Sequence, residues 1–190
     1  MSKRPLTLTT FIHEDLKDYD TDRLYQDHFD WILDEIARIS GRTLDMVFVP
    51  PTDAKVIGAY EYKKEDEGES LQGLLYRIRS YKRQMRANHN RIYDDNTDKF
   101  LLLTRDDINN RALGVANLPG QLAIASITEK TTVAHEIGHM FNANHEDFDE
   151  NITTYYGPHH SIMDPYARPN AFAFSKKNRE NIVNYLNQFD

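Results

Sequence analysis

The sequence predicts a fold of the α/β class (α+β), in which strands and helices share a single domain. Short apolar runs typical of strands are interleaved with longer segments whose apolar residues recur every three or four positions, as in amphipathic helices. The 190 residues suffice to bury one hydrophobic core. The 9 phenylalanines, 11 tyrosines and 1 tryptophan supply enough apolar area to argue against disorder throughout the chain.

The N-terminal segments predict a strand, a helix and a second strand in that order. Residues 6–11 alternate in the manner of a strand. Thr21 is a candidate N-cap, and Gly41 is placed to end the helix that follows it. The apolar run at 43–51 ends in two prolines and predicts a buried strand. The apolar face of the helix consists of Tyr25, Phe29, Ile32, Ile36 and Ile39.

The later segments predict a second long helix, two more strands and a final helix. The charged segment 62–70 reads as an exposed loop, and apolar residues within 71–85 then recur at helical spacing. Apolar runs at 99–104 and 121–127 predict strands, and a helical pattern runs from Ser175 to the C-terminus. The other face of the second long helix is basic and is most simply a solvated face, with an acidic partner or substrate as the alternative. Its cations are Arg77, Arg79, Lys82, Arg83 and Arg86.

Composition excludes several classes of site and partner. A formal charge of −7 argues against nucleic acid or an anionic membrane as the main partner. With no cysteine, the chain has no disulfide, thiolate ligand or cysteine nucleophile, so a metal site must use nitrogen and oxygen ligands. No apolar run approaches the length of a membrane span, and no signal peptide is visible at the N-terminus.

The segment HEIGHMFNANH, residues 135–145, predicts a metal site on a helix. His135 and His139 are four residues apart, so their side chains share a helix face and can bind one Zn²⁺ at about 2.0–2.1 Å. Glu136 lies beside that face and is placed to accept a proton from a water that the metal activates. The predicted ligands are therefore His135 and His139, with Glu136 as the general base.

A third ligand at His145 requires the helix to end between His139 and His145. Continued as helix, His145 would lie roughly 9 Å further along the axis, out of coordinating range. Asn142 can end the helix, because asparagine tolerates the left-handed conformation better than any residue except glycine. An isolated HExxH pattern arises by chance in many sequences, and the third histidine at this offset is what favours zinc.

These residues resemble the metzincin zinc peptidases, whose motif is HExxHxxGxxH followed by a Met-turn. His135, Glu136, His139 and His145 match the motif, Asn142 replaces its glycine, and SIMDPYA (161–167) supplies the Met-turn with Met163. Within the metzincins the chain is most similar to the adamalysin (reprolysin) branch, on the segments 100–120, His145-Glu146 and 174–186. The absence of cysteine departs from the disulfide-bearing members of that branch.

The resemblance implies a fold and an activity. The fold would have a twisted, mostly parallel N-terminal sheet with two long helices, an active-site helix, a Met-turn and a C-terminal helix. The domain would span 1–190, with an N-terminal subdomain (1–142) and a C-terminal subdomain (143–190). The activity would be zinc-dependent endopeptidase cleavage with one catalytic Zn²⁺, and Met163 would form an apolar floor beneath the metal. Nothing in the sequence assigns a calcium site.

The resemblance also implies where substrate binds. An extended protein or peptide substrate would pair with an edge strand above the cleft, and the predicted strand is 121–127 with Leu122, Ala123 and Ile124. Residues 165–171, including Pro165 and Tyr166, would line the side-chain pocket. The resemblance suggests a secreted or extracellular location, and the sequence assigns no oligomeric state.

Two other readings stay open at the level of sequence. The first is a zinc-stabilised binding module that has lost turnover, against which the intact Glu136 argues. The second is a cytosolic regulatory peptidase of a different clan, which also carries HExxH but takes its third ligand from a later acidic residue and has no Met-turn.

Overall fold

The computed structural model describes residues 3–154, 157–166 and 171–189, and a five-stranded sheet lies at its centre. The strands are β1 (Leu6–Ile12), β2 (Leu44–Val49), β3 (Asp98–Thr104), β4 (Gly114–Ala116) and β5 (Leu122–Ser126). Their order is β2-β1-β3-β5-β4. The pairs β2–β1, β1–β3 and β3–β5 are parallel, and β4 pairs antiparallel with β5. The predicted α/β class with a mostly parallel sheet is confirmed.

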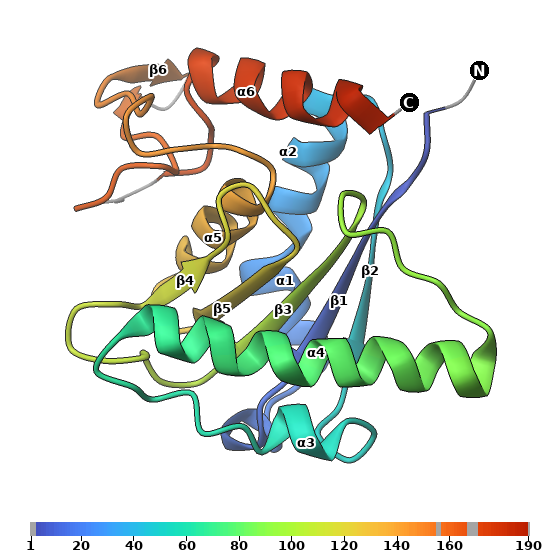
Figure 1. The fold of residues 1–190 in the computed structure, drawn as a ribbon. Helices are drawn as coiled ribbons and strands as arrows, with labels where there is room; N and C mark the ends of the chain where they lie inside the picture. The colour runs from blue at the N-terminus through green and yellow to red at the C-terminus, as the bar shows by residue number, and fades with distance from the viewer. Residues whose placement is uncertain (1–2, 155–156, 167–170, 190) are drawn as a thin grey trace.

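Helices cover both faces of this sheet (Figure 1). One face packs against α1 (Thr21–His28), α2 (Asp30–Ser40), α5 (Thr132–Met140) and α6 (Lys176–Leu186). The opposite face packs against the short α3 (Lys55–Gly58) and the long α4 (Glu67–His89). Smaller elements are the 3-10 turns η1 (Glu14–Leu16) and η2 (Asn187–Phe189) and a hairpin of β6 (Ile152–Thr154) and β7 (Gly157–His159). None of the helices in the described ranges is both long and apolar enough to cross a membrane.

The first predicted helix is two helices, α1 and α2, which meet at Phe29. The φ of −119° at Phe29 breaks the regular helix, while Ile32 and Leu33 still donate their backbone N–H groups to Phe29 O. Apolar periodicity continues through this kink and therefore could not reveal it. The N-cap is Asp20, whose Oδ1 accepts from Asp22 N at 2.9 Å, so the prediction of Thr21 is wrong by one residue.

Two other elements differ from the prediction. The strand predicted to be buried, β2, is an edge strand, and Val47 is 53% exposed. Its apolar run resembles that of a central strand because its inner face packs on α1 and α2. The segment predicted as an exposed loop contains the buried Tyr62 and Ser70, and α4 already begins at Glu67, capped by Asp66. The predicted subdomain boundary at residue 142 stays a prediction; one core cluster includes residues from both sides of it.

A lysine on the central strand β3 is completely buried. Lys99 Nζ donates to Gly120 O at 2.6 Å and to Tyr185 Oη at 3.2 Å. The ammonium also lies 5.1 Å from the ring centroids of both Phe141 and Tyr185. Burial disfavours the charged form and lowers the pKa of Lys99 from 10.5 to about 7, although nearby aspartates oppose this shift.

Lys99 is expected to make the stability of the domain depend on pH. Between about pH 7 and about pH 10.5 the unfolded chain binds more protons at this lysine than the folded chain, so the free energy of unfolding rises with pH in that window. The rise should be of the order of 2 kcal/mol between about pH 7 and about pH 9. Urea unfolding of the wild type and Lys99→Met at both pH values measures it. A Lys99→Met variant with the same pH dependence as the wild type would contradict this assignment.

Candidate metal centre

The helix α5 holds two histidines on its buried face. His135 and His139 are only 4% and 8% exposed, and their ring centroids lie 4.7 Å apart. Each Nδ1 hydrogen-bonds a main-chain oxygen: His135 with Ile162 O at 2.8 Å, and His139 with Ala143 O at 2.9 Å. A carbonyl oxygen can only accept, so both Nδ1 atoms carry the proton. In the neutral rings, the Nε2 lone pairs then point toward the cleft.

The end of α5 turns the chain back toward these rings. Asn142 has a φ of 75°, in the left-handed region. Its N–H donates to His139 O at 3.0 Å, and Ala143 N donates to Gly138 O at 2.9 Å. This pair of bonds defines a Schellman motif, which ends a helix sharply and reverses the chain. The reversal places the exposed His145 opposite His135 and His139.

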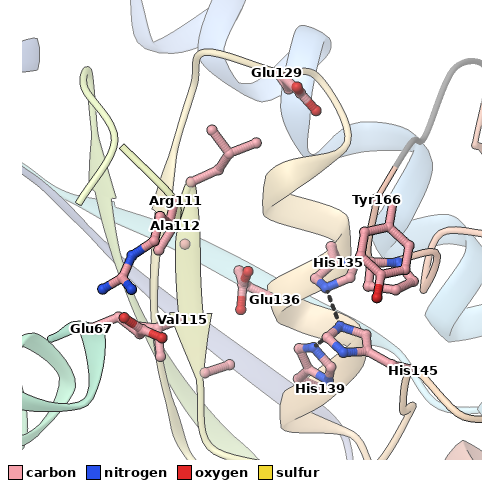
Figure 2. A pocket seen from close by; sticks show the side chains of 14 residues that line it. Glu67, Arg111, Ala112, Val115, Glu129, His135, Glu136, His139, His145 and Tyr166 are labelled. Carbon is pink, nitrogen blue, oxygen red and sulfur yellow. Dashed lines mark hydrogen bonds between the residues drawn. The ribbon is translucent and has the colours of Figure 1, made fainter. Parts of the chain in front are cut away.

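The three imidazoles converge through their Nε2 atoms (Figure 2). His145 Nε2 lies 2.9 Å from His135 Nε2 and 3.1 Å from His139 Nε2. Neutral rings cannot satisfy this arrangement by hydrogen bonds among themselves, because His145 Nε2 carries at most one proton for two acceptors. Tetrahedral Zn²⁺ with Zn–N bonds of about 2.05 Å would hold such atoms about 3.3 Å apart. The donor set and its spacing therefore fit a divalent metal of the zinc type.

The carboxylate of Glu136 lies between α5 and the strand β4 (Figure 2). Glu136 is 5% exposed, and it approaches β4 at Gly114. A Cβ atom at position 114 would lie 2.8 Å from Glu136 Oε1 and 2.7 Å from Ile124 O. Only glycine at position 114 allows this contact without displacing the Glu136 carboxylate or the backbone of β4. Gly114 therefore sets the distance between the edge of the sheet and the Glu136 carboxylate.

A cleft of about 410 Å³ opens over the histidines. Its floor holds His135, Glu136 and His139, and one wall is the strand β4. Pro165 and Tyr166 line the cleft as the family resemblance implies, but several other lining residues were not predicted. These unpredicted lining residues are Glu67, Arg111, Ala112, Leu113, Gly114, Val115, Ala116 and Glu129. Of the predicted pocket segment 165–171, positions 167–170 lie outside the described residues, and Ala171 is buried.

The strand next to the cleft is β4, so the prediction of 121–127 as the edge strand is wrong. Leu122, Ala123 and Ile124 belong to β5, which lies between β3 and β4, and all three are completely buried. Hydrophobic runs identify strands buried on both faces, whereas β4 has three half-buried residues and no detectable periodicity. The available signal was the small-residue run GVA, 114–116, that follows the turn-rich segment.

Met163 lies beneath the ligand helix. It is completely buried, and a Cβ atom at Gly138 would lie 2.7 Å from its Sδ. The turn that carries it is also held by the buried Asp164, whose Oδ1 accepts from Tyr166 N at 2.8 Å. Asp164 Oδ2 lies 2.6 Å from His160 Nδ1. This segment therefore provides an apolar contact under α5 and the main-chain oxygen that orients His135.

Comparisons with known proteins agree with this arrangement. A reprolysin-type sequence profile described as metallo-peptidase family M12 matches residues 58–175, which include the histidine segment, β4 and Met163. No curated protein sequence matches the chain.

One solved structure shares the fold at low sequence identity, and two others are similar to a lesser degree. Metalloproteinase-II from Bacteroides fragilis superimposes with a TM-score of 0.64 and 15% identity, over 97% of this chain and 53% of that chain. This chain thus spans about half the length of that relative. A zinc-dependent peptidase from Methanocorpusculum labreanum gives a TM-score of 0.48 at 15% identity, over 92% of this chain and 99% of that chain. Archaemetzincin from Methanopyrus kandleri gives 0.45 at 17% identity, over 96% of each chain.

Proposed function

Because the chain belongs to metallo-peptidase family M12, we propose that it is a zinc-dependent endopeptidase acting on protein or peptide substrates. The observation that carries the proposal is the convergence of three imidazole Nε2 atoms beside Glu136, in a cleft walled by an edge strand. His135, His139 and His145 would hold one zinc ion. A tetrahedral site with three protein ligands keeps its fourth position open, as catalytic zinc requires.

The proposed chemistry divides the work between the metal and Glu136. Zinc, when bound, supplies Lewis acidity that lowers the pKa of the attacking water and polarises the scissile carbonyl. Glu136 accepts the proton of that water at a carboxylate oxygen and passes it to the leaving amine. The close approach to Gly114 holds this carboxylate between α5 and β4, the strand along which we propose the substrate binds. Ile162 O and Ala143 O keep the Nδ1 protons of two ligands in place, so their Nε2 atoms stay available.

The edge of β4 is the proposed binding line for the substrate backbone. One side of β4 pairs with β5, and its other side faces the cleft. An extended peptide can add there as a further strand, with main-chain hydrogen bonds supplying affinity and side-chain pockets supplying selectivity. Pro165 and Tyr166 line the opposite wall, where they would contact substrate side chains.

Incubation of the zinc-loaded protein with casein, followed by mass spectrometry of the products, tests the proposal. Internal cleavage that is lost in Glu136→Ala is the expected result. Trimming from chain ends alone would contradict the endopeptidase assignment. No cleavage with zinc fully bound would favour the alternative of a binding module without turnover.

Gly114→Ala is expected to slow cleavage without releasing zinc. The added methyl group would collide with Glu136 Oε1 and Ile124 O, so either the carboxylate or the strand must move. Misplacing a catalytic group by about 1 Å can cost up to roughly 100-fold in rate, and we expect a loss of 10- to 100-fold in kcat/KM. Peptide-cleavage kinetics, with zinc content and thermal unfolding as controls, measure the effect. An unchanged kcat/KM would show that Gly114 does not position the base.

A further inference from the structure

The third ligand of the proposed metal centre comes from a loop. His135 and His139 lie on helix α5, whereas the exposed His145 follows the last residue of that helix, Met140, by five positions (145 − 140). The left-handed turn at Asn142 fixes the start of this loop. The position of His145 Nε2 relative to the other two Nε2 atoms therefore depends on what holds the main chain next to His145.

The side chain of Asn178, on α6, holds that main chain. Its Oδ1 accepts from Asn144 N at 2.8 Å, and its Nδ2 donates to Asn144 O at 3.0 Å and to Asp147 O at 3.1 Å. Asn178 is completely buried, and these three bonds match the acceptor and the two N–H donors of its amide. The carbonyl group of Asn144 belongs to the peptide bond that continues to His145. The amide of Asn178 therefore fixes the peptide plane from which His145 begins.

Helix α6 is anchored to the rest of the domain and can serve as a fixed support for this loop. Its buried face, which includes Ile182, belongs to the main core cluster. Arg179 forms an ion pair of 3.0 Å with the buried Glu35 of α2. The N-cap Ser175 accepts from Asn178 N at 3.1 Å, and its hydroxyl donates to a main-chain oxygen of the loop. The loop is thus attached to the first turn of α6.

Asn181, three residues later on α6, contacts the same loop in a different way. Its Nδ2 donates to Asp147 Oδ2 at 2.7 Å, and Asn144 Nδ2 donates to the same carboxylate oxygen at 3.0 Å. These bonds join side chains, so they stabilise the loop without holding the peptide plane that carries His145. Comparison of Asn178 with Asn181 therefore separates support of the loop in general from control of the main chain at the ligand.

We propose that Asn178 is a positioning residue of the metal centre, which acts on metal binding through His145; this inference rests on the proposed zinc site. Zn–N bonds of about 2.0–2.1 Å leave little freedom in the spacing of three ligand nitrogens. Groups that orient ligands typically contribute roughly 10- to 100-fold to metal affinity. An apolar side chain at position 178 would remove the bonds that the main chain of Asn144 and Asp147 now makes with Asn178.

Zinc affinity, measured by competition with a chromophoric chelator, tests the inference without turnover. Asn178→Ala removes all three side-chain bonds, and Asn178→Asp keeps the size and the acceptor but neither donor. Asn181→Ala is the matched control. Affinity should fall roughly 10- to 100-fold in both Asn178 variants and less than about threefold in the control. Thermal unfolding of the metal-free proteins shows which variants are folded, and Asn178→Asp carries the test if Asn178→Ala does not fold.

A double-mutant cycle with His145→Ala shows whether Asn178 acts through this ligand. If it does, Asn178→Ala should change zinc affinity by less than about twofold once His145 is absent. A role in stability alone would leave the zinc affinity of the folded Asn178 variants unchanged, and that result would overturn the inference. So would an equal loss of affinity in Asn181→Ala, or an undiminished effect of Asn178→Ala in the His145→Ala protein.

Failure of the proposed peptidase function would give a different result. A wild-type protein that binds zinc through His145 but does not cleave casein would contradict the peptidase activity, while the affinity losses in the Asn178 variants would still support the positioning role. Equal zinc affinity of the wild type and His145→Ala would contradict the proposed metal centre, and the inference about Asn178 with it.

Discussion

Replacing Glu136 by glutamine is expected to reduce peptide cleavage by roughly 10²- to 10⁴-fold, the usual contribution of a general base. Glutamine has the shape of glutamate and fits the same space beside Gly114, but its amide cannot accept the proton of the attacking water. The effect should fall on kcat, because the contacts of the substrate with β4 remain. Steady-state kinetics on a fluorogenic peptide provide the measurement.

Zinc content separates loss of the base from loss of the metal in this experiment. Glu136→Gln should retain zinc as the wild type does, since the three imidazoles are unchanged. Glu61→Gln, which makes the same change at an exposed position, is the matched control. A Glu136→Gln protein that cleaves at the wild-type rate would show that another group accepts the proton.

His145→Ala is expected to weaken zinc binding by more than about 100-fold while leaving the fold intact. Removal of a direct ligand should exceed the 10- to 100-fold losses that follow removal of groups that only support ligands. His145 is exposed, so alanine leaves no buried cavity, whereas His135 and His139 are buried and bonded to main-chain oxygens. Elemental analysis after dialysis against a chelator series measures the affinity, and thermal unfolding without metal reports on the fold.

His89→Ala is the matched control for this experiment, because His89 is an exposed histidine at the end of α4. If His145→Ala binds zinc with the affinity of the wild type, a residue other than His145 must be the third ligand. That outcome would support the reading in which a later acidic residue completes the site. Cleavage should fall in parallel with zinc occupancy if the metal is catalytic.

The sequence predicted the elements that depend on local pattern. The spacing of His135 and His139 follows from helix geometry alone, and Gly41 ends α2 with a φ of 65° as its position predicted. Asn142 could be interpreted because asparagine and glycine share a tolerance for the left-handed region. The family resemblance, now supported by the match to family M12, added the Met-turn assignment, which stays a prediction.

Features that depend on tertiary contacts could not be predicted in this way. The edge position of β4 follows from its antiparallel pairing with β5, and three half-buried residues leave no periodic pattern. The partners of His135 and His139 are main-chain oxygens, which every residue carries, so no side-chain pattern identifies them. The need for glycine at position 114 arises from the approach of Glu136, a residue 22 positions later (136 − 114).

The use of main-chain oxygens at the metal centre has a consequence for sequence divergence. Ala143 and Ile162 orient the histidines through their carbonyl groups, so their side chains can be exchanged for others of similar volume without altering the ligands. Between them, the β6–β7 hairpin forms a separate two-stranded sheet. Insertions and deletions in this hairpin leave the metal centre unchanged if the backbone at position 162 keeps its path, because Ile162 O orients His135. The length of this hairpin can therefore change while the metal-binding geometry is kept.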